Sequence, residues 1–201
     1  MDISEVPSQA KLPTTFADFK IRVFHEKNTG LDHVALTLGS MSGPDPVLTR
    51  MHSECLTGDV FASLRCDCGP QLQASLSGIA EKGWGVVLYL RQEGRGIGLH
   101  AKIQAYNLQD KGVDTVDANL MLGHPDDARD YQIAKTMLDA IGVKEVCLLS
   151  NNPDKVDQLA NYGVAVVDRL PLIVGVGDEN REYLATKVKR MGHLIEMDDS
   201  D

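Results

Sequence analysis

The chain has 201 residues, of which 43% are apolar and 24% charged, and its formal net charge is −9. This balance is typical of a water-soluble globular protein, and no apolar run reaches the roughly 18 residues that a membrane span needs. The acidic charge and the absence of a basic stripe argue against a protein that follows a nucleic-acid backbone. A few inward-pointing arginines would still allow a small anionic substrate.

The length predicts a single domain, residues 1–201, with a core large enough to fold without disulfides. We expect about residues 1–10 and the acidic residues 196–201 to be flexible ends. The first residues show no basic segment followed by an apolar one, so we expect no secretory signal and a cytoplasmic location. Disulfides rarely persist there, which favours metal binding for clustered cysteines.

The first predicted elements form an antiparallel hairpin. Residues 19–24 and 33–38 have the pattern of strands, and the turn between them contains residues 28–30, Asn-Thr-Gly. Residues 43–46, Gly-Pro-Asp-Pro, are expected to be a loop. Residues 50–69 carry the cysteines and are expected to be irregular.

Helical spacing begins at Gln71 and is expected to end at Gly83. Residues 86–90 form a short apolar run that predicts a buried strand. The glycine-rich residues 91–98 then lead into a second helix that ends near Gly112. Three of its residues are expected to lie on one face: Leu99, Ile103 and Tyr106.

The second half predicts parallel strands. A further helix is expected to bury four apolar residues and to stop at Gly142: Ile133, Met137, Leu138 and Ile141. Strand 146–149, a helix capped by Asn152 and strand 164–167 then make a β-α-β unit, which pairs strands in parallel. We therefore predict an α/β fold: a mixed sheet with an N-terminal antiparallel hairpin and later parallel β-α-β units, with helices packed on the sheet.

Three of the four cysteines lie close together in the sequence: Cys55, Cys66 and Cys68. A structural zinc ion usually has four protein ligands, whereas a catalytic one has three and a water, so the pattern favours a zinc ion that takes part in chemistry. The alternative is three reduced cysteines in a core. His52 and Glu54 match half of the zinc-deaminase pattern, but the other half is missing. Cys147 lies in an apolar strand and is expected to pack in the core.

Two groups of basic residues differ in their context. Arg91 and Arg95 flank a glycine-rich turn before a helix, where backbone N–H groups and guanidinium groups suit a phosphate. The simpler alternative is a tight turn alone. Three residues near the C-terminus have the pattern of a solvated helix face: Lys187, Lys189 and Arg190.

Two further stretches allow a structural and a functional interpretation. Asp126 or Asp127 is favoured as a helix cap, with Arg129 as a surface charge. Ser150 lies just before the expected start of another helix and Lys155 lies in its first turn, so both are placed to reach a phosphate.

Six longer motifs occur along the chain: RMHSECLTGD at 50–59, LRCDCG at 64–69, RQEGRGIGL at 91–99, DTVDAN at 114–119, LSNNP at 149–153 and KRMGH at 189–193. In this order they resemble the GTP cyclohydrolase II family over about residues 11–193. The resemblance implies an enzyme that opens the imidazole ring of GTP and releases formate and pyrophosphate, the first step of riboflavin biosynthesis. It also implies one zinc ion per chain, magnesium with the GTP phosphates, a homodimer, and the single-function form of the family.

The motifs also imply roles for individual residues. Cys55, Cys66 and Cys68 would hold the zinc ion, Asp127 would accept a proton and Arg129 would act at the α-phosphate. Because arginine stays protonated in proteins, we expect Arg129 to position and stabilise the phosphate. The remaining residues would contact GTP: Arg50, Met51, His52, Ser53, Glu54, Gln71, Glu93, Gly94, Arg95, Tyr106, Thr115, Ser150 and Lys155. Glu54 and Glu93 are the candidates for the purine edge.

Two alternatives to the full reaction stay open at this point. One is an arrested enzyme that stops at the formamide or retains the pyrophosphate. The other is a zinc-stabilised module that binds nucleic acid, although the net charge disfavours it. We expect GTP as the small-molecule partner, and neither nucleic acid nor membrane.

Overall fold

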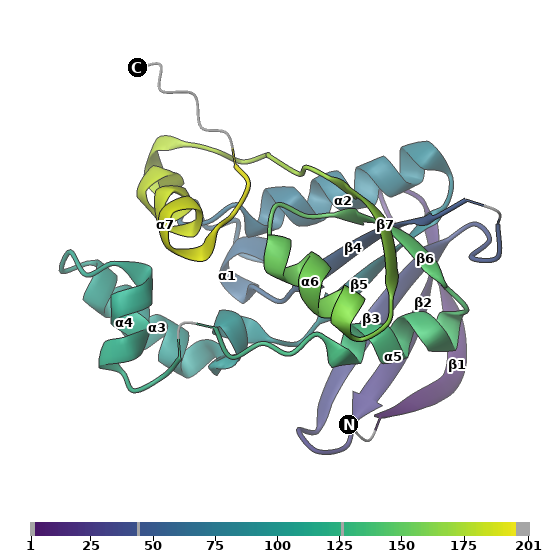
Figure 1. The fold of residues 1–201 in the computed structure, drawn as a ribbon, viewed down its shortest axis with the longest axis horizontal. Helices are drawn as coiled ribbons and strands as arrows, with labels where there is room; N and C mark the ends of the chain where they lie inside the picture. Colours follow the sequence, from purple (N-terminus) through teal and green to yellow (C-terminus); the bar gives the residue numbers. More distant parts are fainter. Residues whose placement is uncertain (1–2, 44, 126, 196–201) are drawn as a thin grey trace.

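The computed structural model describes residues 3–43, 45–125 and 127–195. Its centre is a seven-stranded mixed sheet in the order β1-β2-β3-β5-β4-β6-β7 (Figure 1). The strands are β1 Ile3–Pro13, β2 Asp18–Glu26, β3 Leu31–Leu38, β4 Val47–Ser53, β5 Gly85–Leu90, β6 Glu145–Leu149 and β7 Ala165–Leu170. The fold class predicted from the sequence is confirmed.

The antiparallel part of the sheet comprises β1, β2 and β3, with β3 also antiparallel to β5. The predicted hairpin is β2 and β3, joined through Gly30 in the left-handed region at φ 71°. Strand β1 begins at Ile3 and its backbone pairs with β2, so residues 3–10 belong to the sheet. The flexibility expected for about residues 1–10 stays a prediction. The expected flexible end at residues 196–201 lies outside the described residues.

The parallel part contains β5, β4, β6 and β7, and β4 lies between β5 and β6. The prediction of an irregular stretch at residues 50–69 was therefore wrong for its first four residues, which belong to β4. Six of the seven residues of β4 are buried, as in other central parallel strands, so its sequence lacks the alternation of a half-exposed strand. Arg50 and His52 also made the stretch look too polar for a buried strand.

Helices cover both faces of the sheet. The helices α5 (Gln132–Ile141) and α6 (Pro153–Asn161) contribute Met137, Leu138 and Leu159 to the larger core cluster. On the other face, α2 (Cys68–Lys82) packs Ile79 against Phe19 and Val87. Cys147 contacts this second cluster, as predicted for a core cysteine.

The remaining helices gather at one end of the sheet (Figure 1). They are α1 Leu56–Asp59, α3 Gly98–Gln109, α4 Thr115–Met121 and α7 Arg181–Met191, with short 3-10 turns η1 Glu93–Gly96 and η2 Asp178–Asn180. The three residues expected on one face of α3 do not form its buried side. Leu99 and Ile103 are exposed, and Ala101, Lys102 and Ala105 are buried. In the described part of the chain, no helix has the length and apolarity to cross a membrane.

Candidate functional site: a three-sulfur centre and a basic pocket

A cavity opens where the parallel strands end. Strand β4 leads to Cys55, β5 leads to the turn η1, and β6 leads to Ser150, and residues of all three segments line the cavity. The crossover after β4 carries α2 on one face of the sheet, and the next crossover carries α5 on the other. The point where successive crossovers pass to opposite faces of the sheet is a topological switch point. In open α/β sheets, ligands bind there, beyond the carboxyl ends of the strands.

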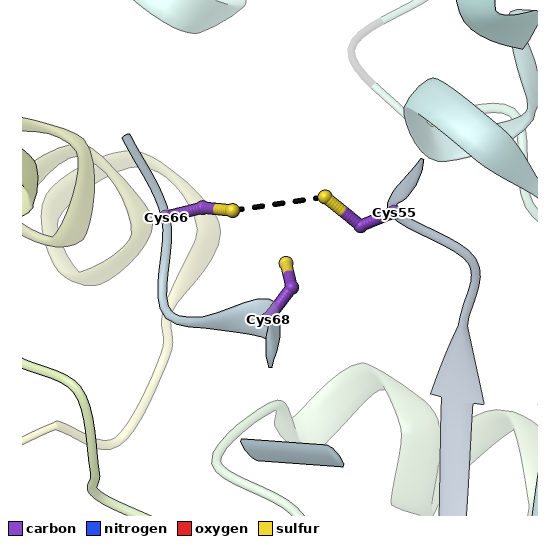
Figure 2. A group of neighbouring side chains, drawn as sticks. All are labelled: Cys55, Cys66 and Cys68. Atoms are coloured by element: carbon purple, nitrogen blue, oxygen red, sulfur yellow. Dashed lines mark hydrogen bonds between the residues drawn. The ribbon is translucent and has the colours of Figure 1, made fainter. Parts of the chain in front are cut away.

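The three clustered cysteines meet at this cavity. Their sulfur atoms lie within 4.8 Å of one another, and those of Cys55 and Cys66 are 3.6 Å apart. Figure 2 shows the three side chains pointing toward a common centre, Cys55 from the segment after β4, and Cys66 and Cys68 from the turn into α2. Among the described residues, no fourth His, Cys, Asp or Glu joins this group.

Two glycines make room for the sulfur atoms. A Cβ atom on Gly58 would lie 2.9 Å from the Sγ of Cys66 and 3.3 Å from the Sγ of Cys55. A Cβ atom on Gly69 would lie 2.2 Å from the carbonyl oxygen of Gly58. Helix α1 can therefore approach the start of α2 this closely only because both positions lack a side chain.

The sulfur atoms cannot all be ionised without a cation between them. Hydrogen bonds from Cys66 and Cys68 lower the pKa of the Cys55 thiol, and the same pairing raises the pKa of Cys68 and raises that of Cys66 to about 11. One thiolate is thus stabilised at the expense of the other two. A divalent soft metal removes this conflict, so the donor set fits a zinc ion with one coordination position left for a non-protein ligand.

Lys102 supports the negative charge at Cys55. Its ammonium group lies 3.2 Å from the Cys55 sulfur and 2.7 Å from Glu93 Oε1. Burial lowers the pKa of Lys102, but the hydrogen bond to Glu93 and the charge at Cys55 outweigh burial, so the net shift is upward. The lysine is therefore a permanent cation beside the sulfur centre.

Glu93 is fully engaged in holding the site together. Its Oε1 accepts hydrogen bonds from Lys102 and from the backbone N–H of Gly94 at 2.8 Å, and its Oε2 accepts from the Leu56 N–H at 2.6 Å. Gly94 and Arg95 both adopt left-handed backbone, at φ 63° and 60°. Because both Glu93 oxygens have partners, Glu54, which contacts Arg91 at 2.8 Å, is the freer of the two glutamates.

A buried network orients the segment before the first cysteine. His52 lies within 2.9 and 3.0 Å of the two oxygens of Asp59, and a carboxylate accepts only, so His52 Nε2 is the donor. Asp59 also accepts from the Cys55 N–H at 3.0 Å and from the Tyr89 hydroxyl at 2.9 Å. Burial lowers the pKa of His52 despite Asp59, so the imidazole is neutral. The network fixes both the ring and the Cys55 backbone.

The opposite part of the cavity is basic. Lys155, at the first turn of α6, is buried and donates to the Met51 carbonyl at 2.8 Å. Burial, together with Arg50 and Arg129, lowers its pKa well below the usual lysine value. Arg129 forms a bidentate pair with Asp127, with one contact of 2.8 Å. Arg50 donates to Gln71 at 2.7 Å and to the Leu149 carbonyl at 2.9 Å. Such a pocket suits a polyanion.

Most residues predicted from the sequence lie around this cavity. Besides the three cysteines, the cavity is lined by Arg50, His52, Ser53, Glu54, Gln71, Glu93, Gly94, Arg95, Tyr106, Thr115, Arg129, Ser150 and Lys155. Met51 and Asp127 do not line it. Met51 is a neighbour of both Arg50 and His52 on β4, and its side chain alternates into the core.

The structural interpretations of two motifs need correction. Asp127 does not cap α5, whose N-cap is Tyr131, and the alternative cap Asp126 lies outside the described residues. Arg129 is not a surface charge, because its side chain is only 12% exposed. Asn152 does cap α6, as predicted. The solvated face predicted for α7 was wrong for Lys187, which is buried and lies 2.6 Å from Asp67.

Several cavity residues were missed by sequence reasoning: Lys102, Asn119, Asn151, Tyr183 and His193. Asp59, which supports His52 from behind, was quoted within a motif but was given no role. The spacing of Ala101 and Ala105 around Lys102 was the available signal, since small residues mark the face on which a helix approaches its neighbours. Asn119, Asn151 and His193 also stand within the quoted motifs but were given no role, whereas Tyr183 had no such signal.

Comparisons with known proteins agree with this geometry. The family described as GTP cyclohydrolase II matches residues 5–171. A GTP cyclohydrolase-2 of Acinetobacter baumannii strain SDF is 59% identical over 196 residues, covering 97% of this chain and 98% of that protein. Those of Cronobacter sakazakii and of Neisseria meningitidis strain FAM18 are 57% and 52% identical over 188 residues, each covering 94% of this chain and 95% of the relative. The chain belongs to the GTP cyclohydrolase II family of hydrolases.

Proposed function

We propose that this protein opens the imidazole ring of GTP, releases formate and pyrophosphate, and yields a diaminopyrimidinone ribosylamine phosphate for riboflavin biosynthesis. Family membership supports the reaction class. The observation that carries the proposal is the pairing, in one cavity, of a three-sulfur centre with a buried basic pocket. The first suits hydrolysis at a base, and the second suits the phosphates of the same nucleotide.

Cys55, Cys66 and Cys68 would hold one zinc ion per chain. When bound, the metal supplies Lewis-acid chemistry that lowers the pKa of water from about 15.7 to about 7, which gives a nucleophile suited to the carbon between the two imidazole nitrogens. The chain keeps the sulfur atoms in place through Gly58, and Lys102 supports the ionised form of Cys55.

The residues around the sulfur centre would orient the base. His52 is held by Asp59 and presents a neutral ring, and its buried Nδ1 has no hydrogen-bond partner among the described residues. Glu54 lies at the same wall and is fixed by Arg91. The hydroxyl of Thr57 lies 3.6 Å from the Cys55 sulfur and 3.3 Å from the Tyr106 hydroxyl, so Thr57 links Tyr106 to the sulfur centre. We assign the guanine edge to Glu54, since both oxygens of Glu93 have partners.

The basic pocket would bind the triphosphate together with magnesium. Arg129 is held by Asp127 before substrate arrives, so little reorientation is needed when its guanidinium group meets the α-phosphate. Lys155 and Ser150 would bind the remaining phosphate oxygens at the start of α6, where the helix N-terminus favours an anion. Asp127 would accept a proton once the phosphate competes for Arg129.

We further propose that the protein is a cytoplasmic homodimer. Large apolar side chains remain exposed near the cavity, three between α1 and α2 and three on α3 and α4: Val60, Phe61, Leu64, Ile103, Leu120 and Met121. Exposed apolar groups of this size are common where a second subunit packs. Light scattering after gel filtration should give twice the mass of the chain, and the mass of a single chain would contradict the dimer.

One incubation tests the reaction itself. Purified, zinc-loaded protein is mixed with GTP and magnesium, and formate, pyrophosphate and the pyrimidine are assayed together. The proposal predicts all three products in equal amounts. Formamide without formate, or formate without pyrophosphate, would identify an arrested enzyme. Unchanged GTP would overturn the proposed function.

A further inference from the structure

Helix α7 and the residues after it close the basic side of the cavity. Four residues from this segment line the cavity: Tyr183, Lys187, Met191 and His193. In Figure 1 the helix lies at the same end of the sheet as α3 and α4, far along the chain from the cysteine motif. The C-terminal segment is therefore part of the wall of the site.

Three residues of this segment fix it to different parts of the protein. Lys187 donates to Asp67, which lies between two of the cysteines, at 2.6 Å. Arg190 contacts two carboxylates at the start of α4, Asp114 at 2.7 Å and Asp117 at 2.9 Å. The backbone N–H of Leu194 donates to the Asn151 carbonyl at 2.8 Å.

His193 is the residue that these contacts place at the basic pocket. Its ring is partly buried, and its Nε2 atom is buried with no hydrogen-bond partner among the described residues. Burial, then the charges of Lys187, Lys155 and Arg129, lower the pKa of His193 to about 3. The ring is therefore neutral, and the basic groups that act on it, Lys187, Lys155 and Arg129, outweigh the carboxylate of Asp67.

An anionic ligand would satisfy both features. Lys155 has a carbonyl as its hydrogen-bond partner and forms no ion pair with a described carboxylate, and its lowered pKa reflects the cost of burying an unpaired ammonium group, which an anion would relieve. A phosphate oxygen in this pocket would accept a hydrogen bond from the His193 ring and would balance the cations around it. Neither a purine base nor a ribose ring would supply that negative charge.

We propose that His193 is a substrate-binding residue that donates its ring N–H to the phosphate chain. Helix α7, which ends two residues before it, holds His193 at the basic side of the cavity. The identity of that chain as the triphosphate of GTP rests on the proposed function. The chemistry that His193 recognises, a polyphosphate, does not.

The test compares His193→Ala with His193→Gln, because glutamine retains an N–H donor of similar reach. We expect the alanine variant to raise the KM for GTP about tenfold, as for the loss of one hydrogen bond to a charged group. Its kcat should change less, and glutamine should recover part of the affinity. His100→Ala, at an exposed position of α3 outside the cavity, is the matched control and should behave like the wild type.

Binding measurements separate this inference from the proposed function. Calorimetry with magnesium tripolyphosphate should show weaker binding to His193→Ala than to the wild type, and guanosine should bind both equally. That result would stand even if the wild type left GTP unchanged. Equal tripolyphosphate binding by the two proteins, with zinc content unchanged, would overturn the role of His193. The role would also be overturned if His193→Ala lost guanosine binding as strongly as it lost tripolyphosphate binding.

Discussion

The two ends of the cavity pose opposite electrostatic problems. At the sulfur end, three thiols lie within 4.8 Å of one another, and the ammonium group of Lys102 is the cation in contact with Cys55. At the basic end, Arg129 and Lys187 have carboxylate partners, whereas Lys155 donates to a carbonyl. The first end suits a bound cation, and the second suits a bound anion.

At each end of the cavity, the fold itself holds the groups of like chemistry close together, before any ligand binds. The glycines of α1 and α2 bring the sulfur atoms together, and the sheet and α7 enclose the cations. Groups of like charge held together before a ligand arrives bind that ligand with less reorganisation, since the protein has already met the cost during folding. A nucleotide beside a metal satisfies both ends at once.

The largest effect is expected from breaking the sulfur end. Cys66→Ser should fold but lose zinc, and formate release from GTP should fall to background, because two sulfur ligands remain. Metal analysis and a formate assay measure both quantities. Cys147→Ser, which alters a half-buried cysteine outside the cluster, is the control and should retain zinc. Formate release by Cys66→Ser at the wild-type rate would exclude the zinc mechanism.

At the basic end, Arg129→Ala should reduce pyrophosphate release by about 100-fold, the typical cost of removing one donor that stabilises developing charge. GTP binding should weaken no more than turnover does, and zinc content should stay unchanged. Arg181→Ala, at an exposed position at the start of α7, is the control. Normal pyrophosphate production at saturating GTP would contradict this role.

The close packing at the sulfur end can be tested without touching a ligand. Gly58→Ala places a methyl group 2.9 Å from the Cys66 sulfur, so zinc affinity should fall about 10- to 100-fold, as for other changes beside metal ligands. Competition with a chromophoric chelator measures it. Gly78→Ala is the matched control, because its Cβ meets nothing within 4 Å. That variant should keep its zinc and gain about 0.5–1 kcal/mol of stability.

The smallest expected effect concerns pH. Lys155 has a lower pKa in the folded protein than in the unfolded chain, so the unfolded chain binds more protons in the window between the two values. Stability contributed at this site therefore rises with pH up to about 10.4, the unperturbed lysine pKa. Lys155→Met should be more stable at pH 7 and should lose this rise, as urea unfolding at several pH values would show. Equal pH slopes for Lys155→Met and the control Lys144→Met would contradict the account.

The same contrast explains what the sequence could predict. The three clustered cysteines lie within one short stretch, so their spacing predicts the cluster directly. The hairpin, α2, α5 and the last β-α-β unit also follow from local periodicity. The strand β4 was missed because a fully buried strand that carries Arg50 and His52 shows no alternation.

The basic end was only partly predictable, because its residues come from distant segments. Lys187 pairs with Asp67, 120 positions earlier in the chain, and no local sequence pattern predicts such a contact. The pattern of α7 indicates a solvated helix, and only the tertiary packing shows that one of its lysines is buried. Resemblance supplied Arg129 and Lys155, but gave no role to His193.

The central claim is that three sulfur atoms hold one zinc ion and leave one position open. X-ray absorption at the zinc edge of the purified wild-type protein tests it most directly. We expect one zinc ion per chain with three sulfur ligands at about 2.3 Å and one oxygen ligand. Four sulfur ligands, or a preparation that opens GTP with no bound metal, would contradict it.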